Sequence, residues 1–483
     1  MKDIYLSTQT TLIITLVVGT FFIALGYINL KKNSDNKSHI IGDRNESILS
    51  LTTSLSASAL GAWILFGPAS AATWGGIGAV IGYALGTAAP MLFLLNFGPK
   101  IRREFPNGMS LTEFVKRRFG TRILKIILIL ILFYLTIFLI AEVTAIAFLL
   151  NLISKTPLWL TSGLTLIICL LYILRGGFKL SIITDKYQFI IVLSIIIISI
   201  FFILGNLEIN SYELIKKKSA KLISINYIPN YTAGLTFFIA VAATNLFHQG
   251  NWQRVFAARN NLILKKSLIY SSIISFLIVL WMGYTGLISF SIDPEIRPDL
   301  AFFKLILLNG NVIIIVSILV LALALTLSTI DTLINAISSL IIIDGKEINK
   351  FLGGREIKNK SNKLILLLSV IVFAFASKGY SILYLFLFAD LLCCAAVVTI
   401  FYGFFKKKIN TRLSLISIIL GLSSGLLFFP SQNFQSSLLV GNIMSVENFS
   451  QIITSNLLFI SFIVATIVPL VIITTYSLRN SLR

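Results

Sequence analysis

The stretch from Ser54 to Gly67, SLSASALGAWILFG, followed by Pro68, decides how this chain folds. It lies inside a long apolar segment but is built largely from Ser, Ala and Gly. Small residues let neighbouring helices approach closely, whereas Ser, Gly and Pro weaken a helix because they compete for its backbone hydrogen bonds or fail to hold them. Two interpretations follow: a tightly packed helix crossing, or a helix that breaks in mid-membrane and offers carbonyl oxygens to a ligand.

Composition indicates a polytopic α-helical membrane protein. The 483 residues are 57% hydrophobic and 12% charged, and the mean hydropathy is +0.92. Apolar runs long enough to cross a bilayer recur along the whole chain. Three cysteines lie in such runs, which indicates small core side chains rather than a disulfide: Cys169, Cys393 and Cys394.

The apolar runs predict about thirteen membrane-spanning helices with the N-terminus outside and the C-terminus in the cytoplasm of a cell (plasma or inner) membrane. With this orientation about three quarters of the 40 Lys and Arg face the cytoplasm, as the positive-inside rule requires. The net charge of +21 therefore favours contact with anionic lipids and not with nucleic acid. Residues 110–122 are expected to form an amphipathic helix at that surface. The predicted spans are 8–30, 47–72, 75–97, 123–152, 157–174, 180–206, 231–250, 267–291, 311–343, 363–378, 380–405, 412–430 and 452–477.

The spans divide into two sets of five, 47–206 and 231–405, within one transporter domain. Because each set holds an odd number of helices, the second is expected to be inverted relative to the first. Both sets open with a helix rich in small and polar residues, the second reading TAGLTFFIAVAATNLFHQG over 232–250. Paired interrupted helices of this kind indicate a binding site at the bilayer midplane of a secondary transporter. Segments 8–30 and 412–477 are expected to be peripheral helices.

A second polar stretch, TLSTIDTLINAISS over 326–339, lies in an otherwise aliphatic span. One or two hydroxyls in a membrane helix usually bond to their own preceding turn, but the seven polar residues over 328–339 exceed that need. Ser328 and Thr329 point in neighbouring directions and offer two hydroxyl oxygens, the ligand type that small hard cations prefer. Carbonyls of a broken second span would complete the site.

The sequence resembles the sodium:solute symporter family, which includes sodium/proline, sodium/glucose, pantothenate and active urea transporters. The resemblance covers about residues 45–405 and implies the five-plus-five inverted core of leucine-transporter (APC) type, with one extra N-terminal and two extra C-terminal helices. Six motifs in the family's order carry it: LSASALGAWILFGPA (55–69), SLTEFVKRRFG (110–120), GGFKLSIITDKYQF (176–189), HQGNWQRVFAAR (248–259), TLSTIDTLINAISS (326–339) and SILYLFLFADLLCCAA (381–396).

The resemblance also implies a sodium site and a solute site. Sodium would be bound by the backbone carbonyls of Ala57, Leu60 and Leu325 and by the hydroxyls of Ser328 and Thr329. The chain departs from proline transporters at Ala59, where they carry an acidic residue, which argues against proline as the solute.

Charged residues within spans are functional candidates because their burial is costly. Asp185 matches a family aspartate on the ion path, and its alternative is an interface residue paired with Lys186 or Arg175. Asp331 lies one turn from Ser328 as a second cation contact or a structural carboxylate. Asp390 is expected to contact solute or a proton, and the alternative is a protonated aspartate bonded to a neighbouring helix. Glu142 has the same two interpretations, of which the bonded structural role is favoured.

The expected solute site takes Ala59, Trp63, His248, Gln249 and Asp390. His248 and Gln249 close the seventh span, where sugar transporters of the family place a polar solute contact; the alternative for both is a structural hydrogen bond. Trp63 is expected to gate or stack on the solute. For Trp252 an aromatic of the membrane interface is the commoner explanation.

These observations predict a sodium-coupled symporter of a small polar solute in the amino acid, urea, sugar or short carboxylate class. Its expected partners are the solute, the sodium ion and the lipid bilayer, with no obligate protein partner and no cofactor beyond the coupling ion. Proton coupling through Asp390, Asp331 and Glu142 is the first alternative, and a membrane sensor that binds solute without transport is the second. An enzyme is not expected. The sequence has two histidines and shows no motif of acidic or Cys/His residues with the spacing of metal ligands or of a catalytic site.

Overall fold

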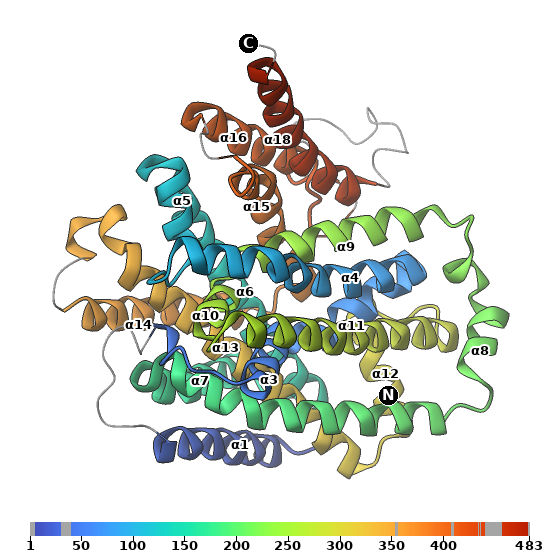
Figure 1. Cartoon of the computed structure of the whole chain (residues 1–483). Helices are drawn as coiled ribbons and strands as arrows, with labels where there is room; N and C mark the ends of the chain where they lie inside the picture. The colour runs from blue at the N-terminus through green and yellow to red at the C-terminus, as the bar shows by residue number, and fades with distance from the viewer. Residues whose placement is uncertain are drawn as a thin grey trace.

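A computed structural model describes residues 5–29, 40–352, 356–406, 410–432, 434, 436–439 and 456–481, and these residues are almost entirely helical (Figure 1). Ten of the described helices are long and apolar enough to cross a membrane. The predicted all-α integral membrane fold is therefore confirmed. The long elements are α1 (Thr8–Asn29), α3 (Ile48–Ala59) with η1 (Ala62–Leu65), α4 (Gly67–Glu104), α6 (Thr121–Ser154), α7 (Leu158–Gly205), α9 (Ile228–Phe247) with α10 (Gln249–Ala257), α11 (Asn261–Ile292), α13 (Val312–Ile348), α14 (Ile357–Ala376), α15 (Ile382–Tyr402), α16 (Thr411–Phe428) and α18 (Leu457–Ser481).

Short helices lie at the two ends of this bundle. The predicted amphipathic helix is α5 (Leu111–Phe119), which a capping box between Ser110 and Glu113 starts. Figure 1 shows α5 and α10 toward one end of the long helices, and α8 (Ser211–Lys218) and α12 (Ala301–Asn309) at the other. The remaining turns are η2 (Ala220–Ile223), η3 (Pro298–Leu300) and η4 (Lys350–Leu352).

Two sharp bends divide α4 and α7 where the sequence separates successive spans. The backbone at Gly76 has φ 60° and at Gly177 φ 57°, values that glycine adopts at little cost. Each bend divides one continuous helical run into two segments, which match the predicted pairs 47–72 with 75–97 and 157–174 with 180–206. The described chain is thus consistent with thirteen crossings. Ten of its described helices are each long and apolar enough to cross a membrane.

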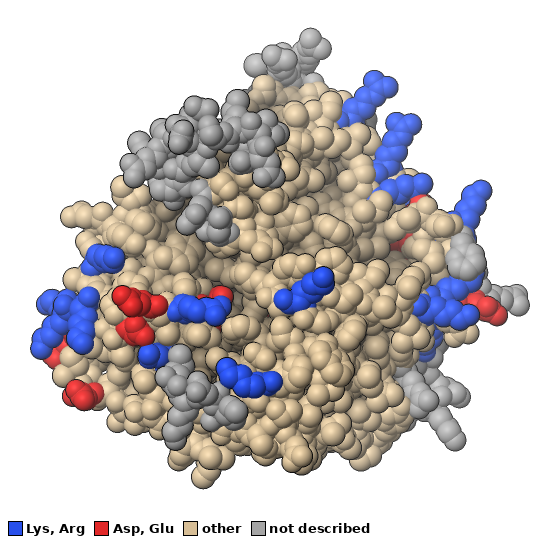
Figure 2. Space-filling view, turned by 180° about the vertical axis from the view of Figure 1, so that it is seen from behind, with Lys and Arg blue, Asp and Glu red and all other residues tan. Residues whose placement is uncertain are grey.

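The helices pack so that the two interrupted elements lie within the bundle. α4 packs along α9 and α11, whereas α3 contacts α7, α11 and α13. α1 lies against α7, and α16 and α18 pack on each other and on α15, so these three helices cover the core from outside (Figure 1). Most of the face in Figure 2 consists of residues other than Lys, Arg, Asp and Glu, as a bilayer requires. The division into inverted repeats at 47–206 and 231–405 stays a prediction.

The length and polarity of 344–362 and 431–451 predict two linkers, and the first of them differs from that expectation in the described region. The segment 344–362 is not a simple linker, because α13 continues to Ile348 and η4 follows it. Residues 353–355 of that segment lie outside the described residues, as do 433, 435 and 440–451 of the second linker, 431–451.

The bend at Gly76 yields a test of the fold. A Cβ at Gly76 would overlap Asn230 Oδ1 and the carbonyl of Leu222, and the positive φ adds strain. We expect Gly76→Ala to lower the free energy of unfolding by about 2 to 4 kcal/mol, seen as a lower thermal midpoint of the purified protein. Gly205→Ala is the matched control, because nothing lies within 4 Å of its Cβ position. Equal midpoints for the two variants would contradict the bend.

Candidate functional site

The stretch 54–67 contains a break in a membrane helix. α3 ends at Ala59, and the amide of Leu60 donates to the carbonyls of Ser56 (3.1 Å) and Ala57 (3.3 Å). Leu60 has φ −108° and ψ 87°, Gly61 is extended, and the chain resumes as the short helix η1. The predicted break in the helix is therefore confirmed, whereas the binding of a ligand by its carbonyls stays a prediction.

A carboxylate from another helix stabilises this break. Glu142, which lies in α6 and is fully buried, accepts a hydrogen bond from the amide of Ala62 at 2.8 Å. An anion suits the start of η1 because the first amides of a helix have no intrahelical acceptor. A Cβ at Gly61 would overlap Glu142 Oε1 and lie 2.9 Å from Thr329 Oγ1. Gly61 therefore lets α6 and α13 approach the break closely, and Glu142 has a structural role.

The predicted sodium ligands belong to two helices. Ala57 and Leu60 are at the end of α3, and Leu325, Ser328 and Thr329 are in α13. Thr329 Oγ1 donates to the carbonyl of Leu325 (3.1 Å), and Ser328 Oγ donates to Asp185 Oδ1 (2.7 Å). The carbonyls of Ala57 and Leu60 belong to the helix end, where carbonyls lack intrahelical donors or keep a free lone pair. Neutral oxygens of this kind fit a small hard cation. The assignment of these five residues as a sodium site stays a prediction.

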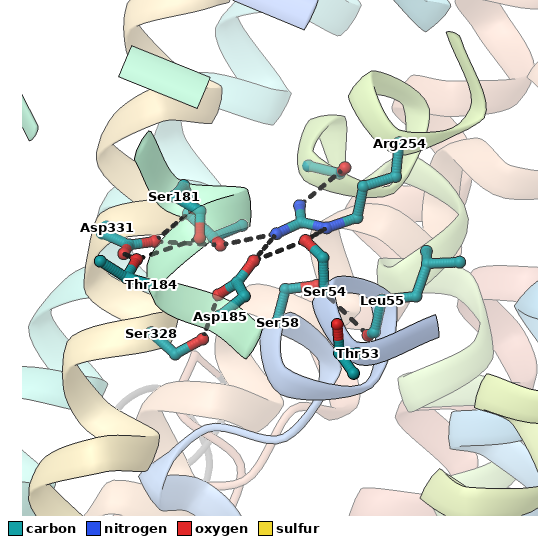
Figure 3. A network of polar contacts seen from close by, with 12 residues as sticks. Thr53, Ser54, Leu55, Ser58, Ser181, Thr184, Asp185, Arg254, Ser328 and Asp331 are labelled. Atoms are coloured by element: carbon teal, nitrogen blue, oxygen red, sulfur yellow. Dashed lines mark hydrogen bonds and ion pairs between the residues drawn. The ribbon is translucent and has the colours of Figure 1, made fainter. Parts of the chain in front are cut away.

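A buried ion pair joins four helices (Figure 3). Arg254 Nη2 of α10 lies 2.8 Å from Asp185 Oδ2 of α7, and both side chains are fully buried. Arg254 Nε donates to Ser54 Oγ of α3 (2.8 Å), and Nη2 also donates to Thr332 Oγ1 of α13 (3.2 Å). Ser54 Oγ in turn donates to Asp185. Arg254 thus ties the two broken helices together.

The sequence interpretation missed Arg254 as a site residue. Among the described residues Asp185 pairs with Arg254 and not with Lys186, and the side chain of Arg175, the other alternative, lies outside the described residues. A signal was available: Arg254 is the one charged residue in HQGNWQRVFAA (248–258), directly after an interrupted span. The sequence gives no distance to a carboxylate 69 residues away.

Asp331 forms a second polar cluster beside the ion pair (Figure 3). Its carboxylate accepts hydrogen bonds from Ser181 Oγ (2.7 Å), Tyr172 Oη (3.1 Å) and Thr184 Oγ1 (3.3 Å). Among the described residues no Lys or Arg forms an ion pair with Asp331. Two buried carboxylates therefore share the field of one guanidinium, and this region carries an excess of one negative charge when both are ionised.

A small internal cavity of about 40 Å³ adjoins the break in α3. Four of the five predicted solute residues line it, which are Ala59, Trp63, His248 and Asp390. The fifth, Gln249, does not, and its Nε2 instead donates to the carbonyl of Met109 at 3.0 Å. The lining residues are Ser58, Ala59, Trp63, Tyr83, Phe138, Val241, Asn245, His248, Thr329, Phe386 and Asp390.

The polar groups of this cavity come from interrupted or facing helices. Asp390 of α15 accepts a hydrogen bond from Thr244 Oγ1 (2.7 Å). His248 stands at the break between α9 and α10, and its Nδ1 has no hydrogen-bond partner among the described residues. Trp63 stacks on Tyr83, with ring centroids 5.4 Å apart. Trp252 is fully buried and donates Nε1–H to the carbonyl of Leu246 (2.8 Å), so the expectation of an interfacial position is wrong.

Comparisons with known proteins agree on the class of this chain. A model of the sodium:solute symporter family matches residues 39–421. The spermidine transporter DUR31 of Candida albicans is 25% identical over 401 residues, which cover 82% of this chain and 75% of that protein. A Na+-coupled sialic acid symporter, solved in a substrate-bound outward-open state, has a TM-score of 0.71 at 15% identity and covers 95% of this chain and 97% of its own. Mhp1, a nucleobase-cation-symport-1 family transporter solved in a closed conformation, has a TM-score of 0.56 at 13% identity and covers 92% and 95%.

The buried ion pair yields a double-mutant prediction. Arg254→Gln leaves Asp185 buried without its counter-charge, so we expect the free energy of unfolding to fall by about 3 kcal/mol or more. Asp185→Asn combined with Arg254→Gln removes both charges and is expected to lose much less than the sum of the two single changes. Thermal unfolding of the four proteins measures this coupling, and additive losses would show that the two side chains do not interact.

Proposed function

Because the chain belongs to the sodium:solute symporter family, we propose that it is a sodium-coupled symporter for a small organic solute that bears an ammonium group. One observation carries the proposal. The internal cavity and the break in α3 share a wall, since Ala59 and Thr329 line the cavity while Thr329 also lies beside Gly61. An ion at the break and a solute in the cavity would therefore be neighbours.

The lining of the cavity supports a cationic solute. Asp390 is its only charged residue, and Trp63 and Tyr83 supply aromatic faces. A carboxylate combined with aromatic faces is a common binding site for ammonium groups. The 25% identical relative from Candida albicans is named a spermidine transporter, which agrees with this class. Neutral and anionic solutes would leave the Asp390 carboxylate without a cation in a buried site.

Coupling follows from the shared wall. A sodium ion that holds the end of α3 in place also fixes Ala59 and Trp63, so solute binds better when sodium is bound, and the reverse holds by linkage. One sodium ion adds roughly 2.3 kcal/mol for each 100 mV of membrane potential to the driving force.

Transport requires alternate opening of the cavity to the two sides. At about 40 Å³ the cavity has room for a few water molecules and is far smaller than sites for organic solutes, so it has to widen to accept one. Toward the predicted cytoplasmic end, the Arg254 network holds α3, α7, α10 and α13 together. Its separation would open that side.

Proton coupling is the second candidate, and Asp331 is the observation in its favour. The carboxylates of Asp331 and Asp185 share one guanidinium, so the uptake of one cation would balance the charge of this region. That cation is sodium in the first proposal and a proton in the second.

Thermal stability separates the two coupling ions. We expect sodium chloride, but not potassium chloride, to raise the thermal midpoint of the purified protein, because an ion that binds only the folded state stabilises it. The double change Ser328→Ala with Thr329→Ala is expected to abolish this shift, whereas Ser317→Ala on the same helix retains it. A shift that persists in the double variant would remove the proposed sodium site. Uptake that follows pH and ignores sodium would select proton coupling.

Uptake into proteoliposomes tests the solute. We expect radiolabelled spermidine to accumulate under an inward sodium gradient, and Asp390→Asn to reduce this uptake at least about tenfold, because a charged hydrogen bond contributes roughly 1.5 to 3 kcal/mol. Glu295→Gln removes an exposed carboxylate outside the cavity and is expected to leave uptake unchanged. Sodium-driven uptake of a neutral solute such as urea, with no uptake of amines, would replace the proposed solute class.

A further inference from the structure

A second and larger cavity opens at the end of the molecule that the charge distribution assigns to the outside. Its volume is about 460 Å³, within the range of sites for small ligands. It lies among the outer part of the first segment of α4, the segment that precedes α12, and the ends of α15, α16 and α18. The lining residues are Ser70, Trp74, Pro298, Asp299, Ser381, Leu383, Pro430, Gln432, Phe434, Leu457 and Leu458.

Asp299 is the charged residue among the described residues of this lining, and no described Lys or Arg forms an ion pair with it. Burial raises the pKa of Asp299 above its ordinary value, and the positive charge of Arg297 opposes that rise only in part. No hydrogen bond to the Asp299 carboxylate is present among the described residues. Asp293 on the same segment differs, because Lys304 pairs with it at 2.8 Å and lowers its pKa. A carboxylate that is partly removed from water and unpaired attracts a cation.

The aromatic content of the cavity narrows the kind of cation. Trp74 and Phe434 line the same space as Asp299. Aromatic faces bind organic ammonium groups through cation–π contacts, whereas a small inorganic cation would need several oxygen ligands. The apolar Leu383, Leu457 and Leu458 suit the methylene chain of an alkylammonium compound.

A row of aromatic rings in contact extends from this cavity to the internal one. Trp74 of the outer cavity packs at a tilt on Phe237, with 5.8 Å between ring centroids, and Phe237 stacks on Tyr83 at 4.5 Å. Tyr83 in turn stacks on Trp63, and both line the internal cavity together with Asp390. The outer cavity therefore lies on the outer side of the rings that line the internal cavity.

We propose that the outer cavity is a second binding site for organic ammonium compounds, with the Asp299 carboxylate and the Trp74 indole as its binding groups. The site is distinct from that of Asp390 and holds the cation before the internal cavity opens to it. This inference rests on the proposed solute class but not on sodium coupling.

Calorimetric titration of the full-length purified protein tests the site. The titrant is butane-1,4-diamine, in potassium buffer, and the background variant is Asp390→Asn, so that the internal site does not contribute. We expect saturable binding in this background, a loss of affinity of at least about tenfold when Asp299→Asn is added, and no change when Glu295→Gln is added instead. The uncharged analogue butane-1,4-diol is expected not to compete.

Several outcomes would overturn the proposal: no binding in the Asp390→Asn background, unchanged affinity after Asp299→Asn, or equal binding of the diol. Trp74→Leu and Trp74→Phe provide a second measurement if Asp299→Asn lowers the thermal midpoint, because only the leucine variant removes the aromatic face. Equal weakening by the two would also contradict the site. Asp299-dependent binding without sodium-driven uptake would remove the proposed function and keep the outer site, whereas the reverse result would remove the outer site alone.

Discussion

The hydrogen bond from the amide of Ala62 to the Glu142 carboxylate is the contact on which the rest of the site depends. A helix that stops within a membrane leaves amides and carbonyls without partners, and each unpaired group costs several kcal/mol there. The Glu142 carboxylate accepts a hydrogen bond from the Ala62 amide at 2.8 Å, on the C-terminal side of the break. The last carbonyls of α3 remain available on the N-terminal side. Gly61 makes this arrangement possible because no side chain separates Glu142 and Thr329 from the backbone. The break is thus a stable feature with spare oxygen atoms, which is what a cation site requires.

The buried charges extend the same logic to the moving parts of the molecule. Arg254 follows the break between α9 and α10 and binds Ser54 in the broken α3, so one side chain connects both interruptions. Its pair with Asp185 adds α7, and its bond to Thr332 adds α13. A buried ion pair of this kind contributes little net stability but makes any partial separation costly. The helices that it connects therefore stay together or separate in a single step. This behaviour suits a transporter that closes its two ends alternately.

Four aromatic rings lie between the two cavities. Trp63, Tyr83 and Phe237 stack in sequence and Trp74 packs at a tilt on Phe237, between the internal cavity of about 40 Å³ and the outer cavity of about 460 Å³. Among the described lining residues each cavity has one carboxylate, Asp390 inside and Asp299 outside. Aromatic rings between two anionic positions offer a passing ammonium group favourable contacts along the route, since each ring face attracts cations.

The amino-acid sequence by itself determined the class of fold and the succession of spans and indicated a break within 54–67, because a bilayer imposes the length and polarity of each crossing and small residues mark its interruptions. Residue types also indicated Ala59, Trp63, His248 and Asp390, which now line one cavity. Only the tertiary structure decided that Arg254 pairs with Asp185, that Gln249 points to Met109, that Trp252 is buried, and that an outer cavity exists. These features depend on the rotation and distance of helices that are remote in the chain, and packing of the complete bundle sets both.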